Sequence, residues 1–214
     1  MKKLRMYPNT SAGLLIVFCG LDGSGKTTLL TRLTDDLKKD RKVFLTKQPT
    51  ENVRQTNIFR TYMDDPDHDD YDYRSLSLLA ASDRIQHTNK TILPRLEAGD
   101  IVISDRYFFS CLANLRARGY KKDKWIYDVA KPIIKPDIAF FCDASVETAV
   151  GRVRRREEEK DRYIDMELQY KLFDEYKGIC KANNGVAVPT DKLSVEESYD
   201  IVKNCVERKL ENGC

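Results

Sequence analysis

The sequence predicts a single α/β domain, a doubly wound five-stranded parallel sheet with helices on both faces. Short apolar runs alternate along the chain with segments of helical periodicity. The first run, LLIVFC at 14–19, is continuously apolar, which is typical of a strand buried on both faces of a parallel sheet. Strands that alternate with helices in this way form right-handed crossovers, with helices on both faces of the sheet.

Each expected strand is a short apolar run. The expected strands lie at 14–19, 43–45, 101–104, 137–143 and 185–188. Helices are expected between them, at 27–38, 75–97, around 123–131, and at 145–156, 165–182 and 194–210. The first helix carries one stripe of leucines, Leu29, Leu30, Leu33 and Leu37, and Gly99 is expected to end the second as a C-cap.

Composition narrows the function classes. The chain has 214 residues, of which 33% are charged and 41% hydrophobic, as in a globular protein with a core. Its formal net charge of +3 gives no reason to expect nucleic acid as a partner. The six cysteines form no C-x-x-C pair and only two histidines are present, so we expect no zinc site, reduced thiols and a cytoplasmic location. No apolar run is long enough for a signal peptide or a membrane span.

The residues between the first strand and the first helix form a motif typical of phosphate binding. The spacing G-x-x-x-x-G-K-[ST] is met by Gly20, Gly25, Lys26 and Thr27. Such a turn presents backbone N–H groups and a helix N-terminus to phosphates. Lys26 is expected to reach the β- and γ-phosphates, and the Thr27 hydroxyl to ligate Mg²⁺. The sequence therefore predicts a P-loop NTPase fold, with phosphate contacts from Gly20, Gly23, Ser24, Gly25, Lys26, Thr27 and Thr28.

A second polar segment follows the third strand, in the order Ser104-Asp105-Arg106-Tyr107. Ligands of open parallel sheets bind at the carboxyl ends of the strands. Asp105 is therefore expected to orient Mg²⁺ or its water, and Arg106 to hold a second phosphate bidentately. An ordinary ion pair at a strand end is the alternative interpretation.

Taken together, the motifs resemble one family. GLDGSGKTT at 20–28, followed by DRYFFSCLA at 105–113, is similar to the thymidylate kinases among the nucleoside monophosphate kinases. LLAASDR at 78–84, KPDIAFFCD at 135–143 and the triplet Asp161-Arg162-Tyr163 resemble further segments of that family. The resemblance covers roughly residues 14–205. It implies an N-terminal extension over 1–13, a kinase domain over 14–210, and a lid at about 153–163.

The resemblance implies transfer of a phosphoryl group from ATP to dTMP. It implies that Asp22 contacts the sugar hydroxyl of the acceptor, that Arg106 holds its phosphate, and that Arg84 reads the pyrimidine edge. Arg152 would lie against the adenine. The other implied acceptor-site residues are Lys47, Asp105, Tyr107 and Tyr163, and the family is commonly dimeric.

The phosphate loop has Gly23 and Ser24 where some family members place an arginine, so the catalytic arginine is expected from the lid. The charge run RRREEEKDR at 154–162 supplies candidates, and we interpret it as a lid in preference to a solvated surface. The acidic run DDPDHDD at 64–70 is interpreted as a solvated loop. The catalytic residues implied are Lys26, Asp22, Arg106, Arg155 and Arg156.

Two positions depart from the family pattern. Lys47 replaces an arginine and so lacks the planar fork that suits phosphate, a loss for which Arg54 could compensate. Ala80 replaces the phenylalanine that stacks on thymine in the family. Such a stack is worth ~1–3 kcal/mol, so thymine specificity requires another ring. The candidates are Tyr71, Tyr73 and Phe109.

Three alternatives remain. A deoxynucleoside kinase needs a general base after the second strand, where this chain has Gln48-Pro49, and an amide cannot take a proton. The second alternative is a monophosphate kinase of the same fold that prefers another base, because Ala80 replaces the phenylalanine that stacks on thymine in the family. A non-catalytic P-loop partner protein is the third, although none of Lys26, Asp105 and the lid arginines is missing.

Overall fold

The computed structural model describes residues 1–68 and 70–211. The strands are β1 (Leu15–Cys19), β2 (Val43–Lys47), β3 (Ile101–Asp105), β4 (Ile138–Cys142) and β5 (Val186–Val188). They form one sheet in the order β2-β3-β1-β4-β5, and every pair is parallel. The predicted α/β fold is therefore confirmed. Because β1 is central and has β3 on one side and β4 on the other, the strand order reverses there, where ligands of doubly wound sheets bind.

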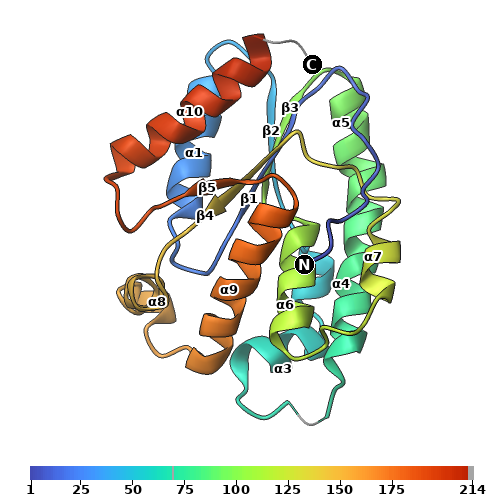
Figure 1. Cartoon of the computed structure of the whole chain (residues 1–214), viewed down its shortest axis with the longest axis vertical. Helices are drawn as coiled ribbons and strands as arrows, with labels where there is room; N and C mark the ends of the chain where they lie inside the picture. The colour runs from blue at the N-terminus through green and yellow to red at the C-terminus, as the bar shows by residue number, and fades with distance from the viewer. Residues whose placement is uncertain (69, 212–214) are drawn as a thin grey trace.

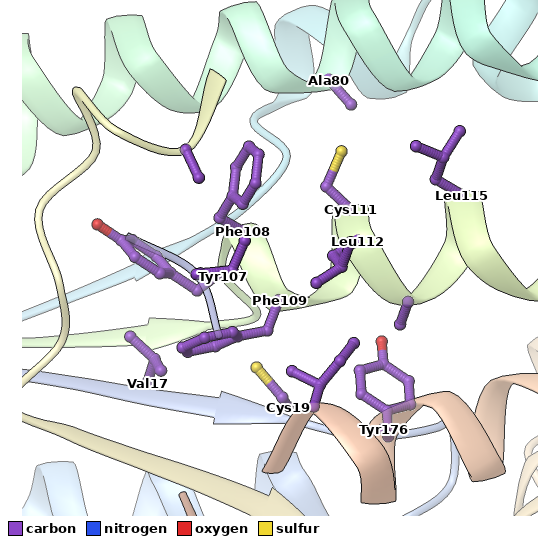
Figure 2. Close-up of a cluster of buried hydrophobic side chains, with 14 of the residues drawn as sticks. Val17, Cys19, Ala80, Tyr107, Phe108, Phe109, Cys111, Leu112, Leu115 and Tyr176 are labelled. Atoms are coloured by element: carbon purple, nitrogen blue, oxygen red, sulfur yellow. The ribbon is translucent and has the colours of Figure 1, made fainter. Parts of the chain in front are cut away.

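Side chains of β1 point alternately into two cores. Leu15, Val17 and Cys19 enter a core beneath the helices α4 (Tyr73–His87), α6 (Phe108–Ala117) and α9 (Met166–Ala182). Ile16 and Phe18 enter a core beneath the helices α1 (Lys26–Leu37) and α10 (Val195–Glu211). Figure 1 shows these helices on opposite faces of the sheet, and Figure 2 shows part of the first core. Cys19 and Cys142 are buried, as predicted, because a reduced thiol packs as a small apolar group. Both faces of the sheet are thus covered.

Most predicted helices are confirmed, with ends that lie within two or three residues of the predicted ones. They are α1 (Lys26–Leu37), α4 (Tyr73–His87), α5 (Leu93–Glu97), α7 (Trp125–Val129), α8 (Val146–Arg154), α9 (Met166–Ala182) and α10 (Val195–Glu211). The helix expected over 75–97 is divided by a π-helical turn, η1 (Thr88–Ile92). Gly99 follows α5 with φ at +81°, as expected of a C-cap glycine.

Three helices were not predicted from the sequence. Helix α6 (Phe108–Ala117) is buried along most of its length, so it lacks the polar face by which an amphipathic helix is recognised. Helices α2 (Glu51–Arg54) and α3 (Asn57–Asp64) are too short to show a periodicity. Residues 65–67 of the expected surface loop are exposed, whereas His68 lies on a pocket wall; residue 69 is outside the described residues.

The first thirteen residues lie against the domain. Leu4 is buried, and its N–H donates to Asn183 Oδ1 at 3.0 Å. Tyr7 pairs with the segment before β4: its N–H donates to the Ile133 carbonyl at 2.9 Å, and its carbonyl accepts from Lys135 at 2.6 Å. Among residues 1–68 and 70–211, no helix combines the length and the apolar character needed to cross a membrane.

Candidate active site

A pocket of about 340 Å³ opens at the carboxyl ends of β1 and β3. The register pairs Phe18 with Asp105, so the loop after β1 and the polar segment after β3 emerge side by side. Of the residues predicted for the site, twelve line the pocket: Gly20, Asp22, Gly23, Gly25, Lys26, Thr27, Thr28, Lys47, Asp105, Arg106, Arg156 and Tyr163. The tertiary structure thus brings most of the predicted residues into one cavity.

The phosphate loop has a backbone that requires glycine. Gly23 has φ of +78°, and a Cβ there would lie 2.0 Å from the carbonyl oxygen of Ala149. Gly25 precedes α1 with φ of +87°. The Ser24 side chain is buried, away from the pocket, and the Ser24 carbonyl accepts from Thr190 Oγ1 at 2.7 Å. Only the backbone of Ser24 is therefore available for a phosphate contact.

Lys26 is buried and folds back over the loop, where Nζ donates to the carbonyls of Leu21 at 2.5 Å and Gly20 at 3.2 Å. Burial and the nearby Arg106 lower the pKa of Lys26 to about 8, against the opposing effect of Asp22 and Asp105. The ammonium therefore sits in a dry, already cationic environment, which favours the arrival of an anion.

Asp22 is held between two arginines. Its Oδ1 accepts from Arg106 at 2.5 Å, and its Oδ2 accepts from Arg162 at 3.1 Å. Burial alone would raise the pKa of Asp22, but the charges of Arg106, Lys26 and Arg162 outweigh it and hold that pKa well below the usual range. This carboxylate stays ionised and is a poor proton acceptor at neutral pH.

Arg106 occupies a strained backbone conformation, with φ of +67°, which is rare for a residue with a side chain. The strain is held by its N–H, which donates to the Phe18 carbonyl, and by its carbonyl, which accepts from Ser104 Oγ at 2.7 Å. Its guanidinium also donates to Tyr176 Oη at 3.0 Å. Burial lowers the pKa of Arg106, but Tyr176, Asp22 and Asp105 outweigh burial and raise it, so the side chain remains a cation.

The charge run after α8 contains a short 3-10 turn, η2 (Glu157–Glu159), and contributes Arg156, Glu159 and Arg162 to the pocket lining. Arg154 holds its two ends together by donating to the carbonyls of Lys160 and Arg162, each at 2.6 Å. Arg156 lines the pocket and pairs with Glu159 at 3.0 Å, whereas Arg155 does not line it. The structure therefore brings Arg156 and Arg162, and not Arg155, to the pocket lining.

Arg152 lies on the other side of the phosphate loop. Its guanidinium donates to the Thr190 carbonyl at 2.9 Å and approaches the Gly23 carbonyl at 3.5 Å. It is outside the pocket lining but flanks the loop, on the side where α8 meets the β5–α10 connection.

The residues predicted to hold Mg²⁺ can be tested against the structure. Asp105 Oδ1 is buried on the pocket wall and has no hydrogen-bond partner, which fits a carboxylate oxygen that a cation would satisfy. Thr27 is exposed in the same pocket, at the start of α1. Hydroxyl and carboxylate oxygens suit a hard cation that keeps several waters. Over the described residues, no cluster of three or more His, Cys, Asp or Glu forms a metal site of protein ligands alone.

Arg84 and Tyr107, both predicted to bind the acceptor, do not reach the pocket. Arg84 is 2% exposed and donates to the Ala80 carbonyl of its own helix at 2.8 Å. Tyr107 is fully buried and donates to the Ile134 carbonyl at 2.6 Å. Figure 2 shows Ala80 facing Cys111 across the contact between α4 and α6. Small side chains meet at this contact, where Ser77 Oγ lies 3.4 Å from Cys111 Sγ.

Aromatic residues line another part of the pocket. They are Phe59 and Tyr62 from α3 and Tyr73 from α4. Of the three rings considered as substitutes for the missing phenylalanine, Tyr73 lines the pocket, while Phe109 is buried in the core and Tyr71 is outside the lining. The pocket therefore combines a cationic end with an aromatic end.

Two cations that line this pocket were not predicted from the sequence to bind a ligand. Arg162 belongs to the triplet that resembles the end of the family's lid, and its pairing with Asp22 depends on how the charged loop folds back. Arg118 follows α6, a helix that was not predicted at all. Arg54, considered as compensation for Lys47, does line the pocket, and its Nε donates to the Pro49 carbonyl at 2.8 Å.

The comparisons with known proteins agree with this geometry. A family model described as thymidylate kinase matches residues 18–200. A probable thymidylate kinase of Thermococcus kodakarensis is 37% identical over 203 residues, covering 92% of this chain and 98% of the relative. A probable thymidylate kinase of Methanocaldococcus jannaschii is 34% identical over 187 residues, covering 87% and 92%. A thymidylate kinase of Enterococcus faecalis is 30% identical over 213 residues, covering 94% and 99%. The chain belongs to the thymidylate kinase family.

Proposed function

We propose that this protein transfers the γ-phosphoryl group of ATP to dTMP and releases dTDP. As a member of its family the chain is an ATP-dependent phosphotransferase. The observation that carries the proposal is the Asp22 carboxylate held by Arg106 and Arg162. This pairing ties the phosphate loop, the end of β3 and the charged loop together around one pocket. Two phosphorylated substrates can meet there.

Phosphoryl transfer needs positioned charge more than covalent chemistry. Lys26 on the phosphate loop would hold the β- and γ-phosphates of ATP, and Arg106 would hold the acceptor phosphate. Arg156 and Arg162 approach from the charged loop, where they would stabilise charge that develops on the transferring group. We propose residues 153–163 as a lid over a domain of residues 14–210, because this loop contributes Arg156 and Arg162 to the pocket lining.

Mg²⁺ would be held by Asp105 and Thr27, the residues whose oxygens fit a hard cation in this pocket. When bound, Mg²⁺ neutralises charge on the phosphate oxygens of ATP. Asp22 would not bind Mg²⁺, because both of its carboxylate oxygens accept from arginines. Its proposed role is to position the acceptor.

The structure also bears on the deoxynucleoside kinase alternative. Gln48 is fully buried, its Nε2 lies 3.0 Å from His87 Nδ1, and it does not line the pocket. Asp22 is a poor base, because its arginines hold its pKa low. A neutral hydroxyl acceptor would need a general base, whereas the phosphate of a monophosphate is largely ionised near neutral pH. These side chains favour a monophosphate acceptor.

Replacement of Arg106 by Ala tests the assignment. The acceptor phosphate loses its buried guanidinium, so kcat/KM for dTMP is expected to fall by at least ~100-fold. ATP binding, measured by calorimetry, should change little because Lys26 and the loop remain. Arg32→Ala, on the surface of α1, is the control. Unchanged activity of Arg106→Ala on dTMP would refute the assignment.

We further propose a cytoplasmic location, a possible homodimer, and nucleotides as the ligands rather than nucleic acid. The five cysteines that the structure describes are free thiols, as in a reducing compartment. Leu78 and Leu79 are exposed side by side on α4 and could contribute to a dimer interface, which size-exclusion chromatography with light scattering would test.

A further inference from the structure

A second cavity, of about 300 Å³, adjoins the active-site pocket and takes no part in the proposed function. Its walls come from Gly20 and Leu21 of the phosphate loop, from the end of β4, from one face of α9 and from Ala187 of the edge strand β5. We refer to it as the β4–α9 cavity. Its volume is within the range of small-molecule sites.

The walls of the β4–α9 cavity are mostly apolar. Phe173, Tyr176 and Cys180 of α9 line it together, because residues three, four and seven positions apart share one face of a helix. Burial and the nearby Asp143 carboxylate raise the pKa of the Cys180 thiol to about 11, so this thiol stays neutral. Opposite α9, Ala187 presents a single methyl group. The cavity can therefore take the apolar part of a ligand.

Charged side chains also line the cavity. They are Lys177 and Lys181, both exposed, and the carboxylate of Asp143. Lys177 Nζ lies 4.5 Å from the centroid of the Phe173 ring. Over residues 1–68 and 70–211, neither lysine forms an ion pair with a carboxylate. Two ammonium groups thus face one carboxylate, and this balance favours an anionic group on an otherwise apolar ligand.

The β4–α9 cavity shares Gly20, Leu21 and Tyr176 with the active-site pocket. The carbonyls of Gly20 and Leu21 accept from Lys26 Nζ, at 3.2 and 2.5 Å. Phosphates of ATP would compete with these carbonyls for the Lys26 ammonium. A ligand that packs against Gly20 and Leu21 as they lie here favours the arrangement in which their carbonyls hold Lys26. Such a ligand therefore opposes ATP.

We propose that the β4–α9 cavity is a second ligand site, which takes a small apolar monoanion, such as an aryl carboxylate or sulfonate, and opposes ATP binding through the phosphate loop. The apolar part of the ligand lies between α9 and Ala187, and its anionic group meets Lys177 or Lys181. The coupling to ATP, but not the site itself, rests on the proposed function. By linkage, ATP weakens the binding of this ligand by the same factor as the ligand weakens the binding of ATP.

The probe that tests the site is 8-anilinonaphthalene-1-sulfonate, an aryl sulfonate that fluoresces in apolar surroundings, titrated with dTMP at saturation. Ala187→Phe fills the cavity from an exposed position of β5 and should lower the affinity for this sulfonate at least ~10-fold. The double variant Lys177→Met and Lys181→Met should lower it on the order of 3- to 10-fold. Lys171→Met, on the same helix but outside the cavity, is the matched control and should keep the affinity of the wild type.

A neutral probe separates the effect of charge from any effect of the substitutions on folding. N-phenyl-1-naphthylamine has the same rings without the sulfonate. The wild type and the double lysine variant should bind it with equal affinity, whereas Ala187→Phe should weaken it as well. If the wild type, Ala187→Phe and the double lysine variant bind the sulfonate alike, the assignment of the site is wrong.

A titration with ATP tests the coupling. As the ATP concentration rises, the apparent Kd of the sulfonate should rise on the order of 5-fold and then level off, because both ligands bind at once. A Kd that rises without limit would show that the probe occupies the ATP site, and the inference would be wrong. A constant Kd while calorimetry shows bound ATP would refute the coupling. Absence of ATP binding in the calorimeter would instead refute the proposed function.

Discussion

At the scale of single residues, Asp22 is an anion inside a loop that binds anions. The structure explains it by the two arginines that Asp22 holds, Arg106 and Arg162, which come from distant segments of the chain. Without a carboxylate between them, these guanidinium groups and Lys26 would repel one another in a partly dry pocket. Asp22 therefore stabilises a cluster of cations that would otherwise be costly to assemble.

The pKa of Lys26 leads to a pH prediction. In the free protein this pKa is about 8, below the ordinary value of 10.5, so the ammonium loses its proton as the pH rises through 8. Bound phosphates would raise the pKa again, because they favour the charged form. We expect kcat/KM for ATP to fall above pH 8, while kcat at saturating ATP stays nearly level to a higher pH. Steady-state kinetics from pH 6.5 to 9.5 would check this, and parallel declines of both parameters would contradict it.

At the scale of elements, small side chains form the contact between α4 and α6. They are Ser77, Ala80 and Cys111, and Arg84, further along α4, is buried. The sequence showed the replacement of the family's phenylalanine by Ala80. It could not show this contact, because the contact depends on residues on two separate helices.

Helices α6 and α9 are joined by a buried ion-pair cluster that gives a stability prediction. Glu175 is 6% exposed and accepts from Arg116 at 2.7 Å, with Lys121 at 3.2 Å on its other oxygen. Arg116→Met leaves the carboxylate with one exposed partner and should lower the free energy of unfolding by about 2–3 kcal/mol. In the double variant, Glu175→Gln added to Arg116→Met should recover part of the lost stability, because no buried charge is then left without its partner. Urea denaturation of the single and double variants would measure it, and an additive loss would contradict the coupling.

At the scale of the whole molecule, the N-terminal segment packs against the domain with residues that do not line the pocket. Leu4 is buried in the core beneath α9, and the backbone of Tyr7 pairs with the segment that leads into β4. The chain before β1 is thus part of the packed body, although its sequence lacks a helix or strand pattern.

Leu4→Ala tests this packing. Removal of a buried leucine side chain should lower the free energy of unfolding by about 2–4 kcal/mol, because a cavity remains in the core. Kinetic constants at low temperature should not change, since Leu4 does not line the pocket. Lys3→Ala, at an exposed neighbour, should stay within about 0.5 kcal/mol of the wild type. Equal, small effects of the two substitutions would show that the segment contributes little.

The sheet, most of the helices and the phosphate loop could be predicted from the sequence. Strands and helices that pack on a core show apolar runs and stripes in their own sequence. The phosphate-binding motif is also local, because Gly20, Gly25, Lys26 and Thr27 lie within eight consecutive residues. The sequence also placed Asp22 and Arg106 in the same site, through two motifs that the parallel register of β1 and β3 brings together.

Which arginines line the pocket could not be predicted from the sequence. Arg84 and Arg155 were expected there, yet one is buried and the other is outside the lining. Arg118 and Arg162 line it instead. The physical reason is that the sequence around a long charged side chain does not show whether it points into a pocket or into solvent. Its direction is set by the packing of the helix beneath it and by partners from elsewhere in the chain, such as Tyr73 for Arg118 and Asp22 for Arg162.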